Sequence, residues 1–132
     1  MAKEFEIVDI WVGRFPGRQA LAQYFQETYN EDDDETPISR LAADMGQRSY
    51  DHDLLEHSYH DQLSMNVLSL LAPHSFSRSY VKQACTAFER MSAPEFNTIL
   101  LSWGGTIRRP SSVRGSDYSL LYLGRFACEP VS

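Results

Sequence analysis

The densest group of side chains able to do chemistry lies in the middle of the sequence, in the stretch YDHDLLEHSYHD. Imidazole and carboxylate groups are common ligands of zinc and of non-haem iron. If the stretch were helical, Asp53, His57 and His60 would share one face at spacings of four and three residues. The stretch holds three histidines and four carboxylates: Asp51, His52, Asp53, Glu56, His57, His60 and Asp61.

A metal site at this stretch would need a recognisable ligand spacing, and the sequence offers none. The pattern H-E-x-x-H does not occur, and His74 is the only other histidine of the chain. Histidines among acidic residues are also typical of a solvated surface. We therefore expect no metal and no cofactor, and we keep a small metal-dependent enzyme built on Asp51–Asp61 as an alternative.

A second concentration of charge is the acidic run in NEDDDETP (30–37). The run lacks the alternating ligands and the central glycine of a calcium-binding EF-hand loop. Two interpretations stay open: a solvated loop, or a phosphate-like surface that competes for the basic groove of a nucleic-acid enzyme. The carboxylates of the run are Glu31, Asp32, Asp33, Asp34 and Glu35.

Other reactive groups give no catalytic signature. Cys85 falls on the apolar face of a predicted helix, where a cysteine packs as a small core residue. No Gly-x-Ser-x-Gly, P-loop or dinucleotide fingerprint occurs. The glycines after Trp103 precede no helix start, so the arginine-rich segment 108–114 is predicted to be a solvated loop, and its role stays open. We predict no catalytic residue and a protein that is not an enzyme.

The overall charge restricts the class of partner. The net charge is −6 and the isoelectric point is near 5.1, which argues against a general nucleic-acid binder. Residues 27–61 contain eleven acidic and only two basic residues, and this asymmetry favours a basic macromolecular partner. Two cysteines, no visible secretion signal and apolar runs too short to span a membrane predict a cytoplasmic protein.

The elements that must position these groups can be predicted from periodicity. Residues 5–15 alternate as a strand covered on both faces, and residues 18–29 form an amphipathic helix. In ISRLAADMG, Ser39 is a plausible N-cap of a short helix. Residues 50–60 are compatible with an edge strand, residues 64–73 with a short helix or a strand, and residues 75–92 with a helix. Two final strands, 96–103 and 117–128, are expected to be joined as a long hairpin.

These elements predict one α+β domain over residues 1–132. Its sheet is expected to be mostly antiparallel or mixed, with helices packed on one face. The first and last strands end in similar sequences, WVGRF and YLGRF, and we expect these strands to be neighbours in the sheet. The predicted structural core comprises Trp11, Gly13, Phe15, Phe25, Trp103, Tyr122, Gly124 and Phe126.

Several short motifs, in order, resemble a known family. They are the strand ending WVGRF, the helix with its Tyr24-Phe25 face, the acidic loop, ISRLAADMG, YDHDLLE, PHSFSRSYV and the closing YLGRF. Together these motifs resemble the Imm22-type immunity proteins (DUF4284-like) of bacterial polymorphic toxin systems.

The resemblance implies a non-enzymatic function, the binding and neutralisation of a cognate protein toxin, often a nuclease, in the producing cell. It favours an interface role for the acidic residues, and it implies no direct contact with nucleic acid or membrane. A general adaptor that binds peptides on a sheet edge stays open as another alternative. The toxin-binding residues expected on this basis are Glu31, Asp32, Asp33, Asp34, Glu35, Asp51, Asp53, Glu56 and Tyr59.

Overall fold

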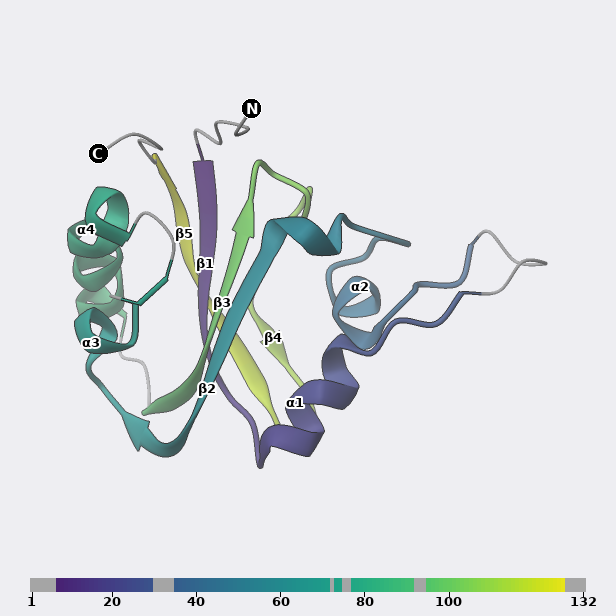
Figure 1. Cartoon of the computed structure of the whole chain (residues 1–132), viewed down its shortest axis with the longest axis horizontal. Helices are drawn as coiled ribbons and strands as arrows, with labels where there is room; N and C mark the ends of the chain where they lie inside the picture. The colour runs from purple at the N-terminus through teal and green to yellow at the C-terminus, as the bar shows by residue number, and fades with distance from the viewer. Residues whose placement is uncertain (1–6, 30–34, 72, 75–76, 92–94, 128–132) are drawn as a thin grey trace.

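The computed structural model describes residues 7–29, 35–71, 73–74, 77–91 and 95–127 (Figure 1). These residues form one five-stranded antiparallel sheet with strand order β2-β3-β1-β5-β4, and the predicted α+β class is confirmed. The elements in chain order are β1 (Ile7–Arg14), α1 (Arg18–Phe25), α2 (Arg40–Asp44), η1 (His52–Leu54), β2 (Leu55–Ser64), α3 (Val67–Leu71), α4 (Ser77–Arg90), β3 (Phe96–Trp103), β4 (Val113–Arg114) and β5 (Ser119–Ala127).

β1 is the central strand and pairs with both β3 and β5. The expectation that the first and last strands are neighbours is therefore confirmed. The predicted long hairpin between β3 and β5 is wrong, because β1 lies between them. The hairpin that does form joins β4 to β5, and the Gly115 N–H donates to the Tyr118 carbonyl across its turn (2.8 Å).

The helices are divided between the two faces of the sheet, which differs from the expectation of one covered face (Figure 1). Val8, Ile10 and Val12 of β1 pack in one core with residues of α3 and α4. Trp11, from the same strand, packs in a second core with residues of α1 and α2. A strand that is apolar on both sides requires cover on both faces, and β1 is such a strand.

Local sequence explains where the short elements begin and end. Ser39 caps α2 as predicted, since its hydroxyl accepts from the Ala42 N–H (3.1 Å). α1 is shorter than the predicted 18–29, because the chain leaves the helix after Phe25 and the Thr28 N–H donates to the Ile38 carbonyl (2.7 Å). The ambiguous stretch 64–73 contains the helix α3. No helix in the described part of the chain has the length and apolarity to cross a membrane.

The two Gly-Arg-Phe sequences lie at opposite ends of the paired strands β1 and β5. A Cβ atom on Gly13 would lie 2.7 Å from a Leu120 methyl carbon and 2.9 Å from the Ser119 carbonyl oxygen, so only glycine fits there. Gly124 has a φ of 142° and lies beside an irregularity in the β1–β5 register. Gly13 is therefore required by close packing between the two strands, and Gly124 by its backbone conformation.

Candidate functional site

Carboxylates gather at one corner of the molecule, where the segment after α1 meets η1; those of Asp51 and Asp53 are exposed and that of Glu27 is partly buried. We call Glu27, Asp51, His52 and Asp53 the acidic corner. The His52 ring lies between two of the carboxylates, with Nδ1 3.2 Å from a Glu27 oxygen and Nε2 3.5 Å from an Asp53 oxygen. The side chain of Asp53 is 85% exposed and that of His52 62% exposed, so the corner is open to a partner.

The backbone around Asp51 fixes the position of the acidic corner. The Asp51 carboxylate caps η1 by accepting from the Asp53 N–H (3.0 Å). The Asp51 N–H donates to the Thr106 hydroxyl (2.8 Å), which ties the corner to the loop after β3. That loop is held in turn by Gln47, whose amide donates to the Thr106 carbonyl (2.9 Å). These hydrogen bonds therefore hold the backbone of Asp51 and Asp53 in a defined position.

The charges of the corner affect the histidine within it. The hydrogen bond with Glu27, followed by the nearby charges of Glu27 and Asp53, raises the pKa of His52 above its ordinary value. Protonation of His52 would cancel part of the negative charge of this surface. The corner is therefore most negative above the pKa of His52.

Two chain segments lead away from the sheet next to the corner (Figure 1). They are held together where Thr28 bonds Ile38, and the Ile38 N–H donates in turn to the Arg48 carbonyl (2.8 Å). Glu35 lies exposed on the second segment. The remaining predicted carboxylates of the acidic run, Glu31, Asp32, Asp33 and Asp34, lie outside the described residues.

The structure separates the predicted binding residues of β2 from the acidic corner. Glu56 faces the side covered by α3 and α4, where Oε1 accepts from Trp103 Nε1 (3.0 Å) and Oε2 lies 3.4 Å from His74 Nδ1. Tyr59 faces the opposite side, and its ring lies 5.1 Å from the guanidinium carbon of Arg18. Of the second predicted cluster, only Asp51 and Asp53 are brought together in an exposed position.

The stretch considered as an alternative metal site is not an α-helix. It forms η1 and then β2, so Asp53, His57 and His60 do not share a helical face. Among the residues that the structure describes, no three histidine, cysteine or acidic side chains are grouped so that they could hold a metal ion.

A further group, which the sequence did not reveal, joins Ser58, His74 and Glu56. The Ser58 hydroxyl lies 2.9 Å from His74 Nε2, and His74 Nδ1 faces Glu56, which is the order of groups in a serine hydrolase. The His74 side chain is only 7% exposed, however, and Glu56 already accepts a hydrogen bond from Trp103. We interpret this inner network as a tie between β2, β3 and the segment after α3. The only sign of this inner network in the sequence was the alternation of a strand, which places Glu56 and Ser58 on one face.

Two further carboxylates, the buried Asp9 and the partly buried Asp44, have structural roles. Asp9 is fully buried and accepts two bonds from the Arg125 guanidinium (3.0 Å each) and one from the Tyr122 hydroxyl (2.5 Å). Burial and this hydrogen bond raise the pKa of Tyr122. Asp44 accepts from the hydroxyls of Tyr24 (2.9 Å) and Tyr118 (2.6 Å), and burial with this bond raises the pKa of Tyr118 to about 12. Asp9 thereby joins β1 to β5, and Asp44 joins α2 to α1 and to the turn before β5.

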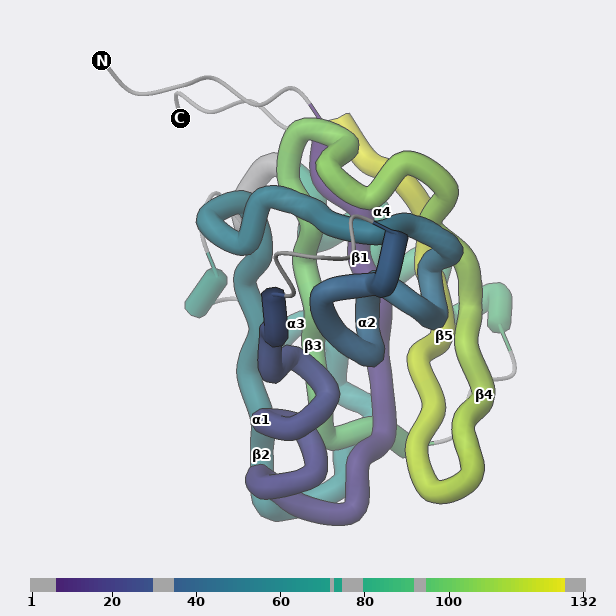
Figure 2. Tube along the Cα trace, turned by 90° about the vertical axis from the view of Figure 1, so that its right-hand side faces the viewer, coloured from purple at the N-terminus to yellow at the C-terminus, as the bar shows by residue number. Residues whose placement is uncertain are grey.

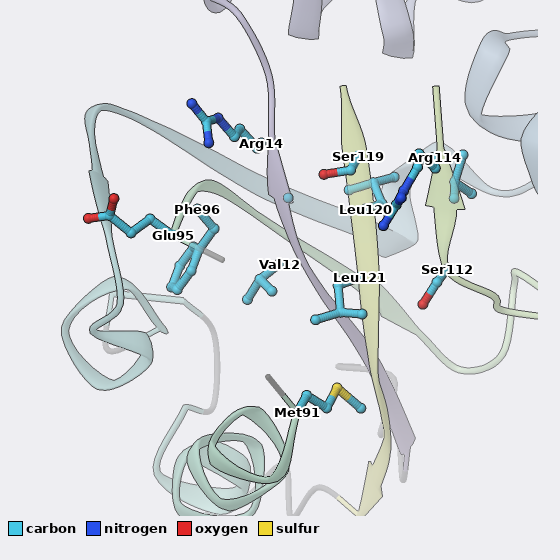
Figure 3. A pocket seen from close by; sticks show the side chains of 12 residues that line it. Val12, Arg14, Met91, Glu95, Phe96, Ser112, Arg114, Ser119, Leu120 and Leu121 are labelled. Carbon is cyan, nitrogen blue, oxygen red and sulfur yellow. The ribbon is translucent and has the colours of Figure 1, made fainter. Parts of the chain in front are cut away.

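A cavity of about 320 Å³ lies between the end of β1, the β4–β5 hairpin and the residue after α4 (Figure 3). Val12, Leu121 and Met91 form part of its apolar lining, and Arg14 and Arg114 contribute two cationic side chains. The cavity contains none of the carboxylates of the acidic corner, and its lining places no histidine beside its two serines, Ser112 and Ser119. It is therefore a separate feature from the candidate site.

The predicted core residues lie in or beside the two apolar cores. Trp11, Gly13, Phe15 and Trp103 are buried, while Phe25, Tyr122, Gly124 and Phe126 are partly buried. Cys85 packs against the core beneath α4, and burial raises the pKa of its thiol, which makes it a poor nucleophile.

Comparison with known proteins gives one match. The family model described as immunity protein 22 matches residues 8–129, which is nearly the whole chain. No curated protein and no solved structure matches the chain.

Proposed function

The chain belongs to the immunity protein 22 family, and on this premise we propose that it binds and neutralises a cognate polymorphic toxin, a nuclease domain, inside the producing bacterium. Membership of an immunity family supports a toxin as the partner. The nuclease activity, the basic groove of the toxin and the cytoplasmic location are parts of the proposal. Inhibition by binding requires a well-positioned surface and no catalytic group.

The single structural observation that supports a basic partner is the acidic corner. Asp51 and Asp53 are both exposed and lie within one turn of each other, and Glu27 lies on the adjoining segment. A nuclease must present cationic groups to the phosphates of its substrate. A fixed group of carboxylates can compete for those cationic groups and can accelerate the encounter of the two proteins.

The proposal can be tested by removing charge without removing shape. In the double variant Asp51→Asn/Asp53→Asn, the amide oxygen at position 51 can still accept from the N–H of residue 53. We expect the association rate with the purified toxin domain to fall about tenfold at low salt, with a weaker dependence on ionic strength. Stopped-flow fluorescence over a series of salt concentrations would measure both quantities.

A matched control removes two carboxylates from elsewhere. Glu89 at the end of α4 and Glu95 before β3 are exposed and lie away from the acidic corner. The variant Glu89→Gln/Glu95→Gln changes the net charge by the same amount and should retain most of the association rate. Equal slowing in the two variants would mean that only net charge matters and would remove the acidic corner from the interface.

A further inference from the structure

The strand β2 is an edge of the sheet, and it begins directly after the acidic corner. Figure 2 shows β2 at one side of the sheet, and in the described part of the chain no strand lies beyond it. An edge strand exposes a row of backbone donors and acceptors that can pair with another chain. Which groups are exposed can be worked out from the hydrogen bonds of the neighbouring strands.

The backbone bonds between β1 and β3 set the pattern. The Gly104 N–H donates to the Ile7 carbonyl (3.1 Å), so these opposite residues form a bonded pair. In an antiparallel ladder, bonded and non-bonded pairs alternate. Ser102 and Leu100, two and four residues before Gly104, therefore also direct their backbone groups towards β1.

The intervening residues of β3 must direct their backbone groups the other way, towards β2. These residues are Ile99 and Leu101, whose partners in β2 are Ser58 and Glu56. The backbone groups of Ser58 and Glu56 therefore form their hydrogen bonds with β3, inside the sheet. By the same alternation, the backbone groups of the other residues of β2 face outward.

The outward residues in the paired part of β2 include His57 and Tyr59. Their side chains lie on the α1 side, where the His57 ring stacks on Phe25 with 4.5 Å between the ring centroids. The open edge therefore combines outward-facing backbone N–H and C=O groups with the stacked rings of His57 and Phe25. Negative charge lies at the start of this edge, where the exposed Asp53 precedes β2. Near the far end, Asp61 is paired with Arg18 (3.9 Å).

We propose that β2 receives an extended, basic segment of the toxin as an added strand of the sheet. This inference rests on the proposed function and specifies how the partner docks. Backbone pairing with His57 and Tyr59 supplies the register, and lysine or arginine side chains of the added strand meet the acidic corner. The negative charge of the acidic corner at the start of β2 selects a cationic segment over an acidic one.

Residue-resolved amide exchange of this chain, free and bound to a catalytically inactive toxin domain from the adjacent gene, tests the docking mode. The amides of His57 and Tyr59 should exchange at least tenfold more slowly in the complex. The Ser58 amide, which already pairs with Ile99, is the internal reference and should change far less. Unchanged exchange at His57 and Tyr59 in a formed complex would overturn the added strand while leaving the proposed function intact.

Failure of the wild-type chain to bind the toxin domain at all would overturn the proposed function, and the docking mode with it. Proline substitution gives a second measurement, because proline is tolerated where a strand N–H faces outward and disrupts a strand where the N–H is bonded. His57→Pro should keep the melting temperature within a few degrees and weaken toxin binding at least tenfold. Ser58→Pro should lower the melting temperature strongly. A larger loss of melting temperature in His57→Pro than in Ser58→Pro would contradict the assignment of which backbone N–H groups of β2 face outward.

Discussion

The acidic corner and the inner network are built from the same short stretch of sequence, and they use the same residue types in opposite ways. At the corner, Asp53 is exposed and His52 lies between carboxylates at the surface. In the inner network, Glu56 and His74 are turned into the molecule and are bonded to Ser58 and Trp103. Only two residues separate Asp53 from Glu56, so the difference comes from side-chain direction and burial and not from composition.

This contrast explains why charge alone does not identify an interface. A carboxylate whose acceptors are occupied inside the fold contributes to stability, and its removal leaves buried donors without a partner. A solvated carboxylate contributes little to stability and remains available to a partner. Mutations in the two regions should therefore affect different quantities.

The largest expected effect is on stability and comes from the inner network. Glu56→Ala leaves the Trp103 N–H and His74 without this acceptor, and we expect the free energy of unfolding to fall by about 1–3 kcal/mol. Urea unfolding would measure the loss. Glu56→Gln keeps an acceptor for Trp103 and should lose less, while the toxin affinity of the folded protein should stay close to that of the wild type. A Glu56→Ala variant of normal stability that fails to bind the toxin would place Glu56 in the interface.

The acidic corner should show the opposite pattern. Asp51→Asn/Asp53→Asn should change the free energy of unfolding by no more than about 0.5 kcal/mol, because solvent screens these charges. The slower association described above would then occur without a loss of stability. If the double variant instead unfolded as easily as Glu56→Ala, the distinction between the two regions would be lost.

The smallest effect concerns pH and His52. Its pKa is raised in the folded protein, so the stability that it contributes is fully present below its unfolded pKa and is lost as pH rises through the folded pKa. The stability difference between wild type and His52→Gln should therefore shrink as pH rises from below 6.5 through the raised pKa. Urea unfolding at several pH values would check this.

The protonation of His52 should also affect the rate of association with the toxin. Protonated His52 reduces the negative charge of the corner, so association of a basic toxin with the wild type should slow as pH falls through this range. The His52→Gln variant should show a weaker pH dependence of its association rate. An identical pH dependence in both proteins would show that His52 is not the group responsible.

Local patterns in the sequence were sufficient to predict much of the fold. The alternation of residues 5–15 predicted the central strand, and Ser39 predicted the start of α2, since both signals lie within a few residues. Long-range pairing was not predictable in the same way. The position of β1 between β3 and β5 depends on contacts across about 100 residues, as does the bond between Asp9 and Arg125.

The candidate site was predictable only in part. The charge of Asp51 and Asp53 was visible in the sequence, but the hydrogen bond that orients Glu56 comes from Trp103, 47 residues away. Glu27 was missed as a member of the corner because it lies 25 residues before His52. Both features have one physical cause: the direction of a side chain is set by the fold, and residue type alone does not reveal it.

Survival of cells that produce the toxin tests the central claim most directly. Cells that co-express the toxin of the adjacent gene with the wild-type chain should survive. Cells with Asp51→Lys/Asp53→Lys should be protected less, at equal amounts of soluble chain. Death of cells that contain ample folded wild-type chain would contradict the proposed function, and full protection by the charge-reversed variant would contradict the role of the acidic corner.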